Sequence, residues 1–185
     1  SSFYFDIRKD VLYCDDLSSK KRKSCVDLLS IILECLLKWY APVLSFTTEE
    51  ITDLTQKGKK ISIHEENFPE VSDNWKNESL YQKWEKLLYV RQQVNIAIEE
   101  KRSAKIIGSS LEADIEIALP KNEFDHLQKT DAKELFITSN VTQNVAKENK
   151  ISVIVKKAKG TKCSRCWKIV EKVEDKKCSR CLEIK

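Results

Sequence analysis

Two Cys-x-x-Cys pairs near the C-terminus constrain the fold of this chain more than any other feature. The first pair is Cys163 and Cys166, the second is Cys178 and Cys181, and eleven residues separate them. Each pair can turn two thiolates toward one point, and a short hairpin can bring both turns to a single tetrahedral ion. Because all four ligands then come from the protein, no coordination position stays open for water. The spacing therefore predicts one structural zinc ion.

Two other uses of the cysteines fit this pattern less well. A thioredoxin-like redox site needs a single Cys-x-x-Cys at a helix N-terminus after a strand. Disulfides are typical of oxidising compartments, and the total of seven cysteines is odd. We interpret the other three, Cys14, Cys25 and Cys35, as small apolar core residues. The pattern favours a reducing compartment and a cytoplasmic location.

The segment 159–185, called the knuckle below, has too few apolar side chains to fold on a core of its own. Metal binding must supply its stability, on the order of 10 kcal/mol in comparable peptides. Residues 156–185 carry eleven Lys and Arg against four Asp and Glu, while the other residues have a net charge of −3. This local +7 favours a nucleic acid as the partner of the knuckle.

Four knuckle residues and four residues near the N-terminus are candidate RNA contacts. Arginine beside thiolates either offsets the charge of the metal site or contacts phosphate, and Trp167 either packs the hairpin or stacks on an unpaired base. A second basic group occupies the expected start of a helix, where positive charge opposes the macrodipole and a phosphate partner would compensate. The candidates are Lys20, Lys21, Arg22, Lys23, Arg165, Trp167, Lys168 and Arg180.

The rest of the chain has the composition of an ordinary folded protein, with 41% hydrophobic and 34% charged residues. No run approaches the ~18 apolar residues of a membrane span, so we expect no membrane partner. We also expect a monomer. The chain contains no methionine, which predicts that it is a piece of a longer protein.

Helical periodicity dominates residues 1–107. Apolar residues at three- and four-residue spacing over 25–39 predict a helix with a wide apolar face, stopped by Pro42. Thr47 and Glu50 have the spacing of a capping box, and Gly58 marks a loop. A long helix is expected over 73–107, ended by Gly108. The expected core includes Leu29, Ile32, Leu36, Trp84 and Leu87.

The period changes after Gly108. Apolar and polar residues alternate over 111–119, which predicts a strand with one solvent-facing side. A short helix is expected over 122–129, further strands over 135–138 and 151–155, and a short extended piece at 61–63. The predicted fold class is mainly α: a helical bundle, then a small α+β module, then the four-cysteine zinc knuckle. The predicted domains are 1–107, 108–158 and 159–185.

Five segments of the chain resemble one protein family. The opening segment 2–10 (SFYFDIRKD) is similar to the start of the anticodon-binding domain of bacterial isoleucyl-tRNA synthetases. The segment 41–50 (APVLSFTTEE) is shared by the related class I synthetases for isoleucine, valine and leucine. Residues 90–95 (VRQQVN), 107–113 (IGSSLEA) and 162–167 (KCSRCW) resemble the isoleucyl type. The order and spacing of these segments cover essentially the whole chain.

The resemblance implies that the helical part binds the anticodon stem of isoleucine tRNA and that the zinc module helps to hold the anticodon loop. The parent enzyme joins isoleucine to its tRNA through an ATP-driven adenylate. Neither the HIGH nor the KMSKS signature occurs in the chain. We therefore expect the catalytic domain, and ATP with it, to be absent, so that this chain binds RNA and catalyses nothing.

Two other functions remain open from the sequence. Formamidopyrimidine-DNA glycosylases carry a similar terminal zinc finger, but they need an N-terminal proline nucleophile and this chain has Ser1. We therefore expect no DNA partner. The other alternative is an interaction scaffold in which zinc only fastens the tail, and failure to bind any nucleic acid at low salt would favour it.

Overall fold

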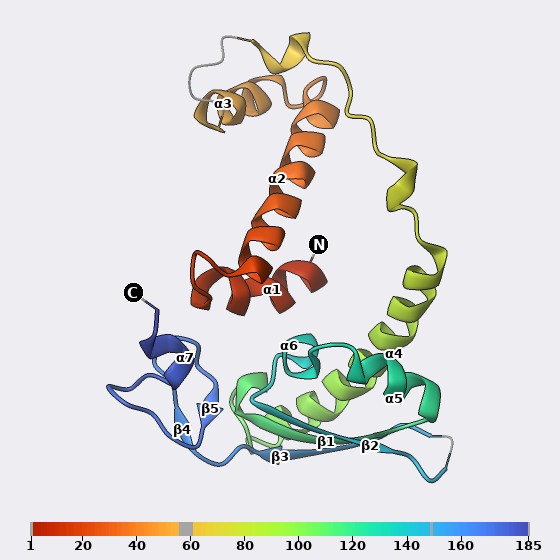
Figure 1. Ribbon diagram of the computed structural model, residues 1–185, viewed down its shortest axis with the longest axis vertical. Coiled ribbons are helices and arrows are strands. Elements are labelled where there is room, and N and C mark those ends of the chain that lie inside the picture. Colours follow the sequence, from red (N-terminus) through yellow and green to blue (C-terminus); the bar gives the residue numbers. More distant parts are fainter. Residues whose placement is uncertain (1, 56–60, 149, 185) are drawn as a thin grey trace. The chain divides into compact units, whose positions relative to one another are not determined.

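The computed structural model describes residues 2–55, 61–148 and 150–184. In this described part the chain forms seven α-helices, a three-stranded sheet and a two-stranded hairpin (Figure 1). The predicted fold class is confirmed, because helices dominate, the sheet module is small and four cysteines cluster near the C-terminus. No helix among the described residues is long and apolar enough to cross a membrane.

The chain divides into two compact units. The sheet unit consists of Ser1–Leu17 and Asn77–Lys185, and the helical unit consists of Ser18–Lys76. The predicted domains, 1–107, 108–158 and 159–185, stay a prediction.

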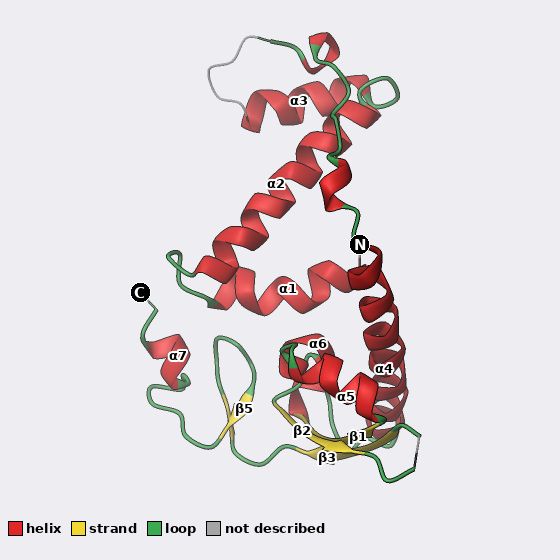
Figure 2. Ribbon diagram, turned by 45° about the vertical axis from the view of Figure 1, so that its right-hand side comes forward, coloured by secondary structure: helices red, strands yellow, loops and turns green. Residues whose placement is uncertain are grey.

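Most helices and all strands belong to the sheet unit (Figure 2). They are α1 (Ser2–Cys14), α4 (Glu78–Ser103), β1 (Ala113–Leu119), α5 (Lys121–Gln128), α6 (Ala132–Phe136), β2 (Asn140–Val145), β3 (Ser152–Lys157), β4 (Thr161–Lys162), β5 (Ile169–Val170) and α7 (Ser179–Leu182). The helical unit contains α2 (Lys20–Tyr40) and α3 (Ser45–Thr55). Single 3₁₀ turns occur at Ile63–Glu65, Asp73–Trp75 and Ser110–Glu112.

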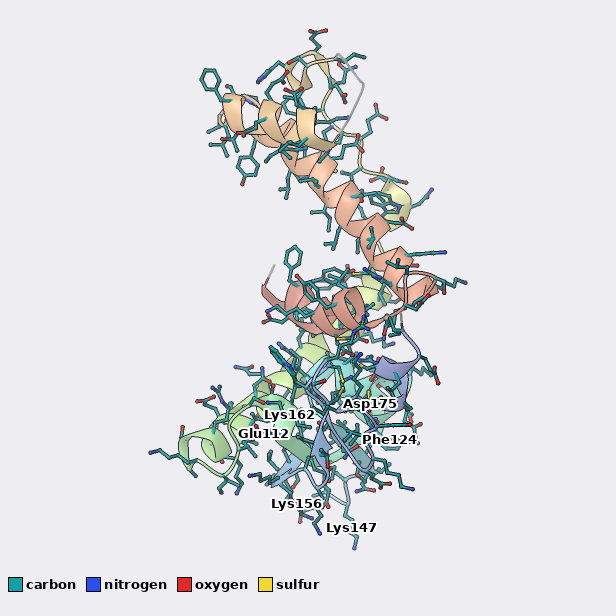
Figure 3. The ribbon with its side chains drawn as sticks, turned by 90° about the vertical axis from the view of Figure 1, so that its left-hand side faces the viewer. Glu112, Phe124, Lys147, Lys156, Lys162 and Asp175 are labelled. Carbon is teal, nitrogen blue, oxygen red and sulfur yellow. The ribbon has the colours of Figure 1, made fainter. Side chains whose placement is uncertain are left out.

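The central strand of the sheet is β1, which pairs in parallel with β2 and antiparallel with β3. The alternation predicted for this strand is confirmed: Ile115 and Ile117 are fully buried, whereas Glu116 lies on the other face. There its carboxylate accepts a hydrogen bond of 2.6 Å from Lys156 of β3, a residue labelled in Figure 3. One face of the sheet therefore carries the core and the other faces solvent.

The long helix α4 packs its apolar stripe on this sheet. Leu87, Val90 and Val94 are fully buried in one cluster with the inward side chains of β1, and α4, α5 and α6 lie on the same side of the sheet (Figure 1). The helix is shorter than the predicted 73–107. Asn77 caps its start by accepting from the Leu80 N–H at 2.9 Å, and Lys105, with a φ of 56°, turns the chain after its end.

The apolar face of α2 is largely exposed, contrary to the prediction that it forms a core. Ile32 and Leu36 are 38% and 40% exposed, and Leu29 is half-buried. The buried cluster of this unit is small and contains Leu37 and Ala41. The reason is geometric: within the helical unit, the main contacts of α2 come from α3 and the turn Ile63–Glu65, which gather at the end near Leu37.

Two local predictions were wrong. Residues 135–138 are not a strand, because Asp131 accepts from the Glu134 N–H at 3.1 Å and caps α6, and the chain then turns at Ile137 with a φ of 56°. Thr47 lies inside α3 and does not cap it. In the segment 61–63, Ser62 is extended as predicted, and the 3₁₀ turn Ile63–Glu65 begins at the next residue. The predicted loop at Gly58 lies outside the described residues.

Neighbouring leucines of α4 test where the core lies. Leu87 is fully buried and Leu88 is 40% exposed. We expect Leu87→Ala to lower the free energy of unfolding by about 2 to 5 kcal/mol, because it leaves a cavity under the sheet. Leu88→Ala is the matched control and should cost less than about 1 kcal/mol. Urea denaturation followed by circular dichroism measures both, and equal losses would contradict this placement of the core.

Candidate metal centre and nucleic-acid interface

The four cysteines predicted as metal ligands lie together. The sulfur atoms of Cys163, Cys166, Cys178 and Cys181 are all within 4.8 Å of one another, and each residue is buried. The Cys166 and Cys178 sulfurs are 3.8 Å apart. An ion bound at about 2.3 Å to four tetrahedral sulfurs separates each pair by about 3.8 Å, so this geometry fits a single metal ion.

Backbone hydrogen bonds shape the two turns that hold these cysteines. The first turn follows β4, and its Trp167 N–H donates to the Cys163 carbonyl at 3.0 Å. The second turn opens α7, where the Cys181 N–H donates to the Cys178 carbonyl at 2.9 Å. Gly160 has a φ of 128°, and a Cβ there would lie 2.3 Å from the Val170 carbonyl oxygen of β5. Only glycine allows the hairpin to close at this point.

The surroundings of the cysteines act in opposite directions on the Cys163 and Cys166 thiols. Burial raises the pKa of Cys166 to about 11. Burial also disfavours the Cys163 thiolate, but backbone N–H groups of Cys166, Cys178 and Arg165 outweigh it and lower the pKa of Cys163 to about 6. The Cys178 N–H points at the Cys163 sulfur over 3.3 Å. Such N–H···S bonds stabilise a coordinating thiolate from the second layer of the site.

Two of the predicted RNA contacts are engaged by a carboxylate of α1. Arg180 donates to both oxygens of Asp10, with Nη2 2.7 Å from Oδ1 and Nη1 2.8 Å from Oδ2. Lys168 Nζ donates to Oδ2 at 2.9 Å, and Arg180 also lies 3.3 Å from Asp15. Burial alone would raise the pKa of Asp10, but these hydrogen bonds and charges lower it to about 2. The carboxylate is therefore ionised at neutral pH.

Further contacts join the knuckle to the sheet unit. Arg165 donates to the Tyr13 carbonyl at 3.5 Å, and the Cys14 thiol points to the Arg165 carbonyl at 3.8 Å. Cys14 is buried against the four clustered cysteines, which agrees with its interpretation as a core residue. Ser139, a buried residue before β2, accepts from the Ile169 N–H at 2.7 Å and donates to the Leu111 carbonyl at 2.5 Å.

Trp167 is largely exposed and lies next to Lys162 of β4. Its side chain is 60% exposed, and its backbone has a φ of 63°, which is rare for a bulky residue and costs about 1 to 3 kcal/mol. The Lys162 ammonium lies 6.0 Å from the centre of the indole ring, and Lys162 is labelled in Figure 3. Stacking of the indole on RNA stays a prediction.

Beside Trp167 lies a groove of about 520 Å³ between α1 and the first metal turn. Its walls include the apolar side chains of Ile7, Leu111 and Ile137, with Tyr13 and Lys133. Apolar walls of this kind accept a flat apolar group.

The other basic group lies in the helical unit. Residues 20–23 form the first turn of α2, and Ser19 caps the helix by accepting from the Arg22 N–H at 3.4 Å. The predicted helix start is thus confirmed. Lys20, Lys21 and Lys23 are exposed and Arg22 is half-buried. Their contact with RNA stays a prediction.

Sequence reasoning missed Asp10 and Ser139. The partners of Asp10 are more than a hundred residues away in the sequence, and Ile169 is thirty residues from Ser139. The local pattern around Asp10 or Ser139 does not predict such contacts. Asp10 lies in the segment 2–10 that carried the family resemblance, but the resemblance does not distinguish it from the other residues of that segment.

Comparisons with known proteins agree with that resemblance. Residues 1–117 match the model of a family described as the anticodon-binding domain of tRNA ligase. An isoleucine–tRNA ligase of Pelagibacter ubique is 49% identical over 169 residues, which cover 91% of this chain and 19% of the relative. Enzymes of the same name from Rhodopseudomonas palustris and Agrobacterium fabrum are 40% and 42% identical over 183 residues. The chain spans about a fifth of the length of these relatives.

Metal analysis of cysteine variants tests the cluster. We expect about one equivalent of a divalent metal per chain, and Cys178→Ser should lose most of it because three thiolates hold the ion far more weakly. Cys35→Ser is the matched control, since Cys35 is a half-buried cysteine of the helical unit, and it should keep the metal. Elemental analysis after exhaustive dialysis gives the answer, and full occupancy in Cys178→Ser would refute the ligand set.

Proposed function

This chain belongs to the family of anticodon-binding domains of tRNA ligases, and we propose that it is the tRNA-binding part of an isoleucine–tRNA ligase. The observation that carries this proposal is the match of residues 1–117 to the family, together with relatives of that name over 91% of the chain. The function of the chain is to bind isoleucine tRNA and to orient its anticodon stem-loop.

The chemistry belongs to the rest of the longer protein. A ligase of this class would join isoleucine to tRNA with ATP in a catalytic domain outside this chain, and the chain itself supplies binding and orientation. Aminoacylation takes place in the cytoplasm of bacteria, which is where we place the protein. We propose that the isolated chain is a monomer.

The metal in the knuckle is zinc in this proposal. Four buried thiolates at tetrahedral spacing form a soft donor set, which suits zinc and excludes ions that prefer oxygen ligands. When bound, zinc supplies folding free energy to the knuckle and no chemistry, because the four cysteines fill its coordination.

The knuckle meets RNA through Trp167 and the basic residues near it. Trp167 is exposed beside a groove with apolar walls, which supports stacking on an unpaired base of the anticodon loop. Lys162 next to the indole is placed to contact phosphate. Residues 20–23 of α2 supply a second phosphate contact. Arg165, Lys168 and Arg180 are engaged within the chain and contribute to RNA binding mainly by fixing the knuckle.

The DNA-repair alternative is not favoured, because the relatives that cover 91% of the chain are named isoleucine–tRNA ligases. The scaffold alternative predicts no RNA binding, and the experiment below distinguishes it from ours.

Filter binding tests the proposed partner. We expect the chain to retain isoleucine tRNA more tightly than an unrelated tRNA, with the affinity for both falling steeply as salt rises. The fall reflects counterions released from phosphates, at roughly 0.7 to 0.9 of a log unit per contact and per decade of salt. Equal affinity for the two tRNAs would contradict isoleucine specificity. No retention of either tRNA at low salt would leave the scaffold as the function.

Two tryptophans of equal exposure test the stacking contact. Trp167 and Trp75 are both 60% exposed, and Trp75 lies in the 3₁₀ turn of the helical unit. We expect Trp167→Ala to weaken tRNA binding by about 1 to 3 kcal/mol with an unchanged salt slope, because stacking releases no counterions. Trp75→Ala should bind like the parent. If Trp167→Ala binds normally, or loses its metal together with its affinity, the indole does not stack on RNA.

A further inference from the structure

We propose that Asp10 of α1 is the positioning residue of the knuckle: its carboxylate holds Lys168 and Arg180, and through them it fixes both metal turns and Trp167 for RNA. The RNA half of this inference rests on the proposed function, whereas the docking half concerns the protein alone.

The contacts of Asp10 with Lys168 and Arg180, called the clamp below, have a geometry that fixes the knuckle on α1. Arg180 reaches both carboxylate oxygens of Asp10 at 2.7 and 2.8 Å, and Lys168 reaches one of them at 2.9 Å. A bidentate arginine–carboxylate contact fixes the orientation of the two side chains as well as their distance, whereas a single hydrogen bond fixes only the distance. The Asp10, Lys168 and Arg180 side chains are only 24%, 22% and 37% exposed. Partial burial of this kind shields the charges from salt.

The two cations that Asp10 holds belong to different metal turns. Lys168 follows Cys166 by two residues in the first metal turn, and Arg180 lies between Cys178 and Cys181 in the second. One carboxylate therefore ties both turns to α1. The metal joins the turns to each other, whereas Asp10 joins both of them to α1, in addition to the contacts of Ile169 with Ser139 and of Arg165 with Tyr13. Asp10, Lys168 and Trp167 all line the groove along α1, so the clamp lies next to the indole that it is proposed to position.

The same contacts argue against a direct phosphate contact by these cations. A phosphate that captured Arg180 would break its hydrogen bonds to Asp10 and leave that carboxylate half-buried beside a second anion. Exposed lysines such as Lys162, Lys172 and Lys176 meet phosphate without that cost. The basic charge of the knuckle thus has two roles, one internal and one toward RNA.

Four variants of the full chain separate these roles. Asp10→Asn and Arg180→Gln remove opposite sides of the clamp, and the double variant tests whether they act as one unit. Lys168→Gln removes one contact of the clamp and leaves the sequence of α1 unchanged. The matched control is Asp125→Asn, because Asp125 also has an ion pair, at 3.0 Å to Lys121, but on α5.

Hydrogen exchange of the metal-loaded chain without RNA is the first measurement. We expect faster exchange in the knuckle for Asp10→Asn, Arg180→Gln and Lys168→Gln, with about one metal per chain retained because all four cysteines remain. Asp125→Asn should match the parent. Unchanged exchange in the three clamp variants would overturn the docking role, whatever RNA does.

Binding to isoleucine tRNA across a salt series is the second measurement. Asp10→Asn and Arg180→Gln should each weaken binding about tenfold with an unchanged salt slope, and the double variant should be no weaker than either. If Arg180→Gln flattens the slope while Asp10→Asn binds like the parent, Arg180 is a phosphate contact and the inference is wrong. If the parent itself binds no tRNA, the proposed function fails, and the exchange measurement still decides the clamp.

Discussion

The convergence of four cysteine sulfurs on one point is the constraint on which the C-terminal part of this chain depends. Neither the two-residue strands of the hairpin nor the four-residue α7 could persist alone, and the buried residues of the knuckle are chiefly the cysteines themselves. A metal ion replaces the apolar core that the knuckle lacks. The proposed stacking of Trp167 on RNA depends on this metal ion, because the first metal turn holds the exposed indole and its left-handed backbone.

The charge of the knuckle has a different meaning in the structure than in the sequence. An excess of lysine and arginine predicts a polyanionic partner, but the count does not say which cations face it. Asp10 accepts hydrogen bonds from Lys168 and Arg180, so these two positive charges attach the knuckle to α1. In our proposal, RNA binds to the lysines that remain exposed and to the indole beside Lys162.

Local chemistry explains which parts of the fold could be predicted from the sequence. The cysteine cluster and β1 follow from fixed spacing and strict alternation, and both were correct. The wide apolar face of α2 did not form the expected core, because periodicity shows that a face is apolar but not what covers it. Helix α6 and the turn after it occupy the strand predicted at 135–138, because the cap at Asp131 stabilises a helix more than the short apolar run favours a strand. The contact of Asp10 with Arg180 joins residues 170 positions apart, and no local pattern encodes it.

Removal of the metal tests the central claim most directly. The core of the sheet unit, built on Leu87, Ile115 and Ile117, shares no residue with the cysteine cluster. A chelator should therefore leave most of the helical circular dichroism in place while the chain loses most of its affinity for isoleucine tRNA, and added zinc should restore it. Collapse of the helical signal would show that the metal organises the whole chain. Unchanged tRNA affinity in the metal-free chain would remove the knuckle from the RNA interface.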